Sequence, residues 1–83
     1  MKVSIRYFAS VREALGPGET LELASGTTVA AVRDALIARD AAHAAVLNRS
    51  RAIRSALDQV LCSEGDLVGE GAEIGFFPPV TGG

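Results

Sequence analysis

The stretch SGTTVAAVRDALIARD, residues 25–40, differs in its apolar period from the segments on either side of it. Five apolar residues in it are spaced as on one side of a helix: Val29, Val32, Ala35, Leu36 and Ile37. Residues three or four positions apart share a helix face, so this spacing predicts an amphipathic helix. Thr27 or Thr28 precedes these residues, and either hydroxyl can cap the helix N-terminus. We therefore predict the main helix of the fold here.

Two segments before this helix alternate apolar and polar residues. KVSIRYF, residues 2–8, and ETLELA, residues 19–24, place apolar side chains at every second position over most of their length. That period is typical of half-buried strands, which we expect to pair antiparallel. SVREALG, residues 10–16, lies between them and predicts a short turn of helix that ends at Gly16 and Pro17.

The segments after the main helix complete an α+β domain. AAHAAVL, residues 41–47, adds a shorter helical piece, and AIRSALDQVLC, residues 52–62, predicts two short strands joined by a tight turn. GDLVGEGAEIGFF, residues 65–77, offers turn glycines and then a last strand. Residues 1–77 are therefore expected to form a mixed sheet covered on one face by the main helix, with the first and last strands side by side.

Length and charge narrow the classes of function. A chain of 83 residues makes one domain, and its net charge of -2 argues against nucleic acid as a main partner. No apolar run approaches the roughly 20 residues of a membrane span and no secretion signal opens the sequence, so we expect a cytoplasmic protein. All eight Lys and Arg residues lie within 1–54, while five of the ten acidic residues lie within 55–83. This asymmetry is typical of a solvated acidic face; a functional interpretation is that the partner receiving the C-terminal end offers a basic surface.

Two aromatic residues fall on the polar side of their predicted strands. If Ile74 and Phe76 face the core, Phe77 must face water, because neighbouring residues of a strand point to opposite faces. Phe8 likewise breaks the alternation of the first strand. Because the first and last strands are expected to be neighbours, Phe8 and Phe77 together predict an exposed apolar patch for a partner.

PPVTGG, residues 78–83, extends beyond the predicted last strand. Pro78 and Pro79 have no N–H for a strand ladder and stiffen the backbone. The segment is therefore predicted to be an extended tail that reaches on the order of 20 Å beyond the sheet. Val80 and Thr81 then offer side chains that a partner can hold.

Gly82 and Gly83 form the candidate reactive end. Without side chains they can enter a channel too narrow for a Cβ, with the terminal carboxylate first. That carboxylate is ionised at neutral pH, with a typical pKa of about 3.5. It can attack the α-phosphate of ATP when an enzyme holds both, and a sulfur donor can convert the resulting acyl-adenylate to a thiocarboxylate.

No other chemistry is predicted. The sequence holds no Ser-His-Asp order, phosphate loop, dinucleotide fingerprint or paired carboxylates with an obvious pocket. Cys62 is expected to pack in an apolar patch, and His43, which has no metal-ligand spacing to other residues, is expected on the surface. We expect the chain to bind neither metal nor cofactor and to catalyse no reaction by itself.

FFPPVTGG, residues 76–83, closely resembles the terminus of the small subunits of molybdopterin synthase, the MoaD-type sulfur carriers of the ubiquitin-like β-grasp group. RYFASVREALG, residues 6–16, looks like that family's opening strand and short helix. TTVAAVRDAL, residues 27–36, looks like its main helix, and GEGAEIGFFPPVTGG, residues 69–83, like its final turn, strand and tail. The resemblance thus runs the full length of the chain.

Two turns depart from the family pattern. Asp58-Gln59 stands where Asn-Gln is usual, and Gly71-Ala72-Glu73 stands where Gly-Asp-Glu is usual. Both substitutions are similar in shape and bear on local hydrogen bonding, not on the tail.

The resemblance implies a sulfur carrier in molybdenum cofactor biosynthesis. An E1-like enzyme of the MoeB type would adenylate Gly83 with ATP, and a donor such as a cysteine desulfurase or a rhodanese-like protein would supply the sulfur. The MoaE-type large subunit, in a heterotetramer with such chains, would use that sulfur to convert cyclic pyranopterin monophosphate to molybdopterin. By motif match Gly82 gives clearance, and Phe8, Leu61 and Phe77 form the interface.

Other functions use the same features. Sulfur carriers of thiamin synthesis and tRNA thiolation share the fold and the Gly-Gly end but generally lack the Phe-Phe-Pro-Pro run. A ubiquitin-type modifier would use the activated carboxylate for an isopeptide bond instead. The identity of the sulfur donor, and whether molybdenum or tungsten is finally bound, do not follow from the sequence.

Overall fold

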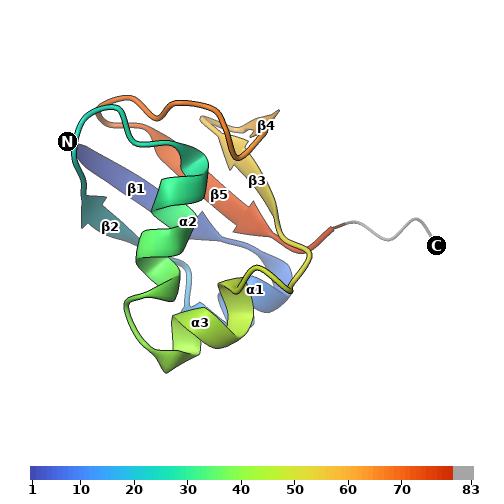
Figure 1. Ribbon diagram of the computed structural model, residues 1–83. Coiled ribbons are helices and arrows are strands. Elements are labelled where there is room, and N and C mark those ends of the chain that lie inside the picture. Colours follow the sequence, from blue (N-terminus) through green and yellow to red (C-terminus); the bar gives the residue numbers. More distant parts are fainter. Residues whose placement is uncertain (80–83) are drawn as a thin grey trace.

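The computed structural model describes residues 1–79. Strands and helices follow one another in the order β1 (Lys2–Tyr7), α1 (Ala9–Leu15), β2 (Gly18–Glu22), α2 (Val29–Ile37), α3 (Ala41–Leu47), β3 (Arg54–Leu57), β4 (Val60–Cys62) and β5 (Glu73–Phe77). Every predicted element is present, so the α+β class is confirmed. Figure 1 shows α2 lying across one face of the sheet, with α1 and α3 below it.

The five strands form one mixed sheet in the order β2-β1-β5-β3-β4. The first and last strands are neighbours in its centre and run parallel, with Ile5 opposite Ile74 and Tyr7 opposite Phe76. The other three pairings are antiparallel. Because β1 and β5 run in the same direction, the N-terminus and the exit of β5 lie at opposite ends of the sheet.

Helix α2 forms where the sequence predicts it. The Thr28 hydroxyl accepts a hydrogen bond from the N–H of Ala31 at 3.2 Å, which caps the N-terminus. Val29, Val32 and Leu36 are completely buried against the sheet. Ala35, which was expected beside this stripe, is exposed instead because it lies on the far edge of the helix.

The core lies between the sheet and the helices. Its buried apolar residues come from all parts of the chain: Val3, Ile5, Tyr7, Val11, Val29, Val32, Leu36, Leu47, Val68, Ala72, Ile74 and Phe76. Full burial of one such aliphatic or aromatic side chain stabilises the fold by about 1.5–3 kcal/mol. The alternation read from β1 and β5 is confirmed, since the core faces of both strands carry the expected residues.

A two-residue turn joins β3 and β4 at Asp58 and Gln59. Their φ angles of 50° and 69° are both left-handed, the geometry of the turn that matches the twist of a hairpin. The Asp58 carboxylate accepts from the N–H of Glu73 at 2.9 Å, and the N–H of Asp58 donates to the Glu73 carbonyl at 2.8 Å. The departure from the family pattern at this turn therefore keeps the hairpin bound to β5.

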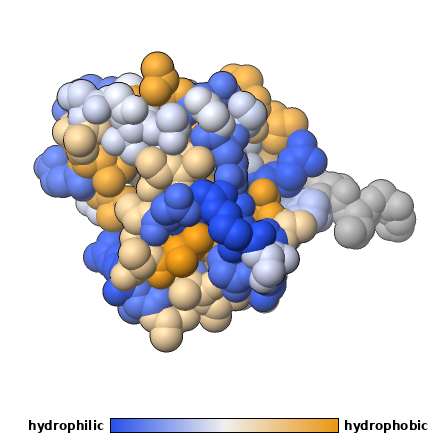
Figure 2. Space-filling model, viewed as in Figure 1, coloured by the Kyte–Doolittle hydropathy of each residue, from blue (hydrophilic) through white to orange (hydrophobic). Residues whose placement is uncertain are grey.

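The surface on the helix side mixes hydrophilic and hydrophobic residues, as Figure 2 shows. No helix within residues 1–79 is long and apolar enough to span a bilayer.

Candidate functional site

The outer face of the sheet, opposite α2, carries the residues expected to bind a partner. Side chains of directly paired residues point to the same side of a sheet. Arg6 pairs with Gly75, Gly75 with Ala56, and Ala56 with Leu61, so these four residues form one row across β1, β5, β3 and β4. The row has small residues in its middle, and a larger side chain at each end.

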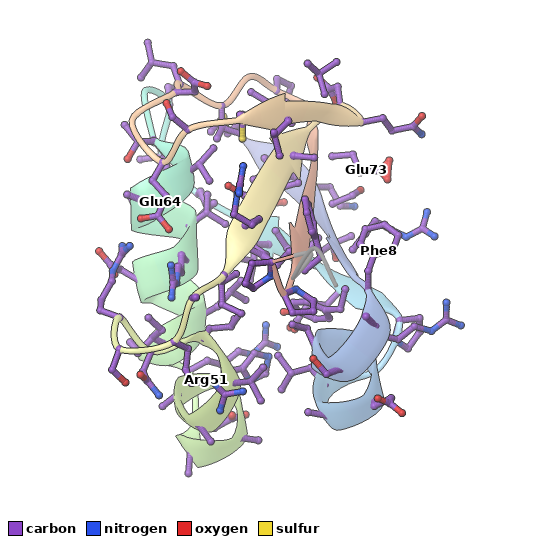
Figure 3. The ribbon with its side chains drawn as sticks, turned by 90° about the vertical axis from the view of Figure 1, so that its right-hand side faces the viewer. Phe8, Arg51, Glu64 and Glu73 are labelled. Atoms are coloured by element: carbon purple, nitrogen blue, oxygen red, sulfur yellow. The ribbon has the colours of Figure 1, made fainter. Side chains whose placement is uncertain are left out.

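Phe8 directly follows β1 and lies on this outer side of the sheet (Figure 3). Its backbone is fixed, because its N–H donates to the Phe76 carbonyl at 3.1 Å and its carbonyl accepts from the N–H groups of Val11 and Arg12. These bonds also begin α1, whose N-cap residue is Phe8. The residue is 41% exposed, which confirms the predicted outward position.

Phe77 ends β5 on the same face, but it is half-buried and not fully exposed as the alternation predicted. Tyr7 pairs with Phe76, so Phe8 and Phe77 come level with each other on adjacent segments of chain. On its other side Phe77 pairs with Arg54 of β3. Phe77 thus has a neighbour on each side on the outer face, which a single-strand pattern does not contain.

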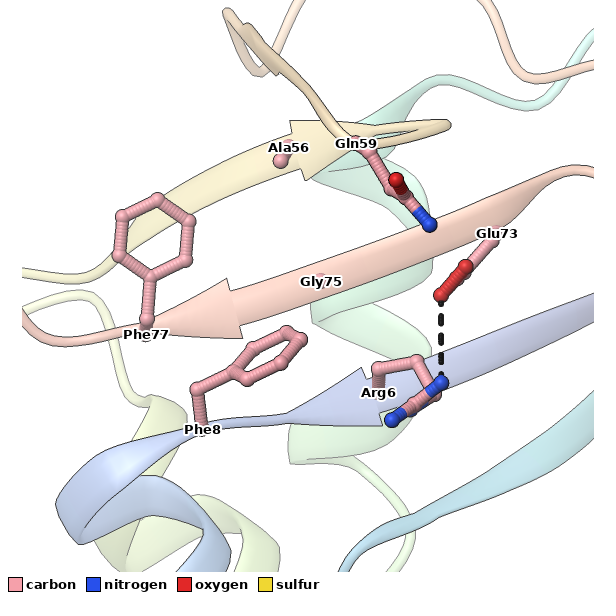
Figure 4. Close-up of a pocket in the computed structure, with 7 residues that line it drawn as sticks. All are labelled: Arg6, Phe8, Ala56, Gln59, Glu73, Gly75 and Phe77. Atoms are coloured by element: carbon pink, nitrogen blue, oxygen red, sulfur yellow. Dashed lines mark ion pairs between the residues drawn. The ribbon is translucent and has the colours of Figure 1, made fainter.

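A hollow of about 430 Å³ extends along this face from the two rings, and we call it the outer-face hollow. Its lining comes from four segments of chain: Arg6, Phe8, Ala56, Gln59, Glu73, Gly75 and Phe77. The small residues Gly75 and Ala56 form its floor. Arg6 and Glu73 form an ion pair of 3.6 Å beside the floor, as Figure 4 shows. The hollow is apolar at the end near the rings and charged at the other.

Leu61 extends this apolar surface to the sheet edge. It is 59% exposed on β4 and shares the outer face with Phe8 and Phe77. Its neighbour Val60 is 68% exposed at the same edge. The structure thus brings the three residues named by the family resemblance to one face, although they lie far apart in the sequence.

The tail begins next to this surface. β5 stops at Phe77, as the two prolines predict, and Pro78 and Pro79 follow it, both half-buried. The predictions for residues 80–83, among them Gly82 and Gly83, lie outside the described residues.

A family model described as the ThiS family matches residues 5–83. The chain belongs to the ThiS family. The molybdopterin synthase sulfur carrier subunit of Escherichia coli is 36% identical to it over 98% of this chain and 99% of that protein. The subunit of the same name from Mycobacterium tuberculosis is 31% identical over 100% of this chain and 99% of that protein.

Solved structures share the fold over the whole chain. The crystal structure of SAMP1 from Haloferax volcanii has a TM-score of 0.80 at 25% identity, and both chains are covered completely. A complex of subunits 1 and 2 of molybdopterin-converting factor from Helicobacter pylori contains a chain with a TM-score of 0.71 at 20% identity, again with both chains covered completely. The expected ubiquitin-like β-grasp fold is thereby confirmed.

This ThiS-family chain also holds a hydrogen-bonded cluster that the sequence did not predict. Tyr7 donates its hydroxyl proton to Glu19 Oε2 at 2.6 Å, and His43 Nε2 lies 2.7 Å from the same oxygen. The other ring nitrogen, Nδ1, lies 2.7 Å from Asp40 Oδ1. Arg39 pairs with the second oxygen of Glu19. The cluster therefore links β1, β2 and α3.

The expectation that His43 lies on the surface is wrong, since only 9% of the residue is exposed. Helix α3 turns the ring inward against Tyr7, whose ring centre is 6.4 Å away. One partner of the His43 ring could have been found from the local sequence. Asp40 precedes His43 by three residues and caps α3 by accepting from the His43 N–H at 2.9 Å. Glu19, the second partner, could be found only from the fold.

The cluster shifts the pKa values of its members. Burial raises the pKa of Tyr7, and the hydrogen bond to Glu19 raises it further. Burial alone would raise the pKa of Glu19, but hydrogen bonds from Tyr7 and His43 outweigh it and hold that pKa below 4.5. Burial alone would lower the pKa of His43, but its bonds to Glu19 and Asp40 outweigh it and place the pKa above 6.5. The cluster therefore favours the protonated, positively charged form of the His43 ring.

Arg33 is a second buried polar residue that the sequence analysis missed; it is 4% exposed. Its guanidinium donates to the carbonyls of Leu47, Asn48 and Arg51 at 2.7, 2.8 and 3.0 Å, and to the Glu64 carboxylate at 2.7 Å. It sits four residues after Val29 on the buried stripe of α2. Arg33 thus fixes the loop between α3 and β3 to the helix.

Cys62 packs against the core as expected, with its Sγ 3.6 Å from Ser55 Oγ. Within residues 1–79 no group of three or more His, Cys, Asp or Glu side chains could hold a metal ion.

Proposed function

We propose that this protein is the sulfur-carrying small subunit of a molybdopterin synthase. Two relatives of that name match it over 99% of their length. Its last eight residues, FFPPVTGG, resemble the C-terminal motif of such sulfur carriers. The observation that carries the proposal is the position of the tail. It begins at Pro78, directly beside an exposed apolar face on which Phe8, Leu61 and Phe77 lie together.

The chemistry belongs to the terminal carboxylate of Gly83. In an E1-like enzyme, a carboxylate oxygen attacks the α-phosphorus of ATP and pyrophosphate leaves. A sulfur donor, such as a persulfide carried by a cysteine desulfurase or a rhodanese-like protein, then attacks the acyl carbon and displaces AMP. After reductive release from the donor by a thiol, the chain ends in a thiocarboxylate, with sulfur in place of one oxygen.

The outer face would determine which protein receives the sulfur. Docking of Phe8, Leu61 and Phe77 against the large subunit would hold the body of the chain, while Val80 and Thr81 guide the tail and Gly82 lets it pass a narrow channel. There the Gly83 thiocarboxylate would deliver sulfur to cyclic pyranopterin monophosphate. Because the tail is six residues long, the reacting group would lie on the order of 20 Å from the docking surface.

Intact-mass analysis tests the proposal directly. The chain is incubated with an E1-like adenylating enzyme, ATP, a cysteine desulfurase, cysteine and a reducing thiol, and the expected product is heavier by about 16 Da, the difference between sulfur and oxygen. A control without ATP should show no change. Addition of the large subunit and cyclic pyranopterin monophosphate should return the original mass and yield molybdopterin. Absence of the heavier species would reject the proposal.

Protein modification is a second candidate function, because SAMP1, named for a small archaeal modifier protein, shares the fold at 25% identity. Here a lysine amine of a target protein would attack the acyl carbon of the same acyl-adenylate, or of a thioester formed from it. AMP or the thiol would leave, and an isopeptide bond would join Gly83 to the lysine. Tryptic digests of cells that express a tagged chain distinguish the two functions. Conjugates carrying the C-terminal residues of this chain on lysine support modification, and their absence together with molybdopterin formation supports the synthase role.

A further inference from the structure

The ring of Phe8 lies directly over Gly75, where β5 has no side chain. A Cβ built at Gly75 would lie 2.9 Å from Cε2 of that ring, 3.6 Å from Cδ2 and 3.9 Å from Cζ. Carbon atoms in favourable contact are about 3.5–4.0 Å apart, so the first of these distances is a clash. Phe8 therefore occupies space that any other residue at position 75 would take. We propose that Gly75 is the positioning residue of the docking surface and sets the orientation of Phe8.

Only the ring can yield to a side chain at position 75. The Phe8 backbone is held by its N–H bond to Phe76 and by the two bonds that its carbonyl accepts from α1. The backbone of Gly75 is equally fixed, because it pairs with Arg6 on one side and with Ala56 on the other. The atom nearest to the added Cβ is at the far end of the Phe8 side chain. A methyl group there would rotate the ring away from the sheet and leave the fold intact.

Rotation of this ring would alter the outer-face hollow. Phe8 and Phe77 flank the hollow, and Gly75 lies in its floor. The guanidinium of Arg6 lies 5.8 Å from the centre of the Phe8 ring and also pairs with Glu73. A displaced ring would therefore change both the apolar end and the charged end of the hollow. We infer that Gly75 keeps it shaped for one apolar side chain of the large subunit, with a polar group of that subunit at Arg6 and Glu73.

This inference rests on the proposed function, because the partner is the large synthase subunit. It explains why a glycine stands inside a central strand, where it weakens the strand and has no side chain to pack. In the free chain the Phe8 ring fills the space above Gly75. In the complex, an aromatic anchor that is already held in this orientation loses less rotational freedom on binding.

The test compares Gly75→Ala with Gly65→Ala, a control in which the added Cβ has nothing within 4 Å. Binding to the purified large subunit is measured by titration calorimetry, and stability by thermal melting. We expect Gly75→Ala to weaken binding by about tenfold, as displacement of one anchor of an interface does, with little change in melting temperature. The control should bind as the unmodified chain does.

A second background separates ring displacement from simple filling of the hollow. Leucine ends at its Cδ atoms and has no Cε2, the only Phe8 atom within 3 Å of the built Cβ, so Phe8→Leu removes the clash. If the ring mediates the effect, Gly75→Ala should weaken binding much less in the Phe8→Leu background than in the unmodified chain. An equal loss in both backgrounds would show that the methyl group acts by itself and would overturn the inference.

NMR of the free chain provides a readout that does not need the partner. Ring protons of Phe8 should show nuclear Overhauser contacts to the α-protons of Gly75, and these protons should lose their ring-current shift in Phe8→Leu. Gly75→Ala should weaken the ring contacts to the backbone at position 75. Persistence of those contacts would refute the positioning role. Failure of the unmodified chain to bind the large subunit would instead count against the proposed function alone.

Discussion

Glu19 Oε2 and His43 Nε2 lie 2.7 Å apart and join the edge strand β2 to helix α3. The opposite ring nitrogen of His43 faces the carboxylate of Asp40, so both nitrogens have an acceptor when the ring is protonated. A neutral imidazole can donate from only one nitrogen and would leave the other facing an oxygen lone pair. The contact is therefore stronger with charged His43, in agreement with the raised pKa.

Stability should consequently depend on pH in a defined window. The folded pKa of His43 lies above its ordinary value of 6.5, so its contribution is complete below about pH 6.5 and is lost as pH rises through the folded pKa. The folded pKa of Glu19 lies below its ordinary 4.5, so its contribution is present above about pH 4.5 and is lost on acidification. Denaturant unfolding should show greatest stability between these values.

His43→Gln should flatten the alkaline side of this profile. Glutamine keeps one polar contact but cannot titrate, so stability should change less between pH 6 and pH 8 than in the unmodified chain. At pH 5.5 the variant should lose about 1.5–3 kcal/mol, typical of hydrogen bonds to charged groups. If it retains the same slope above pH 6.5, His43 is not the group responsible.

The three phenylalanines should differ in stability. Phe76→Ala empties a completely buried site and should cost about 3–5 kcal/mol. Phe8→Ala should cost far less, because the ring is on the outer face, and Phe77→Ala should lie between the two because it is half-buried. Thermal melts provide the ranking. Equal destabilisation by Phe76→Ala and Phe77→Ala would show that the faces of β5 are assigned wrongly.

The same three variants should follow a different order in their affinity for the large subunit. Phe8→Ala and Phe77→Ala should each weaken association with the large subunit by about 2 kcal/mol or more, as the loss of a central aromatic anchor does. Folded Phe76→Ala should bind much as the unmodified chain does, because its ring faces the core. Titrations below the melting temperature of each variant measure this, and unaffected binding by both outer-face variants would contradict the docking surface.

Arg33→Met should destabilise the fold by about 2–4 kcal/mol. It leaves the carbonyls of Leu47, Asn48 and Arg51 without their donor inside a largely buried site, and it removes one of the two arginine partners of Glu64. Arg49→Met is the matched control, because Arg49 also pairs with Glu64 but is largely exposed, and exposed ion pairs contribute at most about 1 kcal/mol. Urea unfolding compares them, and similar losses in both variants would argue against a special role for Arg33.

Asp58→Ala should weaken the hairpin by about 1–2 kcal/mol, since alanine at a φ of 50° is strained and cannot accept from the Glu73 N–H. Asp58→Asn should be nearly neutral, because asparagine tolerates this backbone and retains an acceptor oxygen. Chemical denaturation of the two variants checks the expectation. A large loss in Asp58→Asn would mean that the charge, and not the geometry, matters at this turn.

One residue added after Gly83 should abolish sulfur transfer without unfolding the domain. Activation uses the terminal carboxylate itself, and a Cβ at the end would crowd the channel. Molybdopterin formation measures the effect, and a melting curve controls for the fold. A chain extended in this way that still supports full molybdopterin synthesis would refute the carrier role.

The sequence by itself determined where the helices and strands lie and where the Pro-Pro segment ends the last strand. Apolar period is a local property, so the positions of α2, β1 and β5 could be read from neighbouring residues, and the inward positions of Ile74 and Phe76 followed from strand alternation alone. The Pro-Pro stop after Phe77 is equally local, because it depends only on the missing N–H.

The tertiary structure decided what residues distant in sequence do to one another. His43 is buried because Glu19 of β2, 24 residues away, lies opposite its ring, and Arg33 is buried because three loop carbonyls converge on it. Phe77 is half-buried at the end of β5, where Phe8 comes level with it across the parallel pairing of β1 and β5. Alternation states which face a side chain takes; only the packing of neighbouring strands and helices determines how much of that face remains open to water.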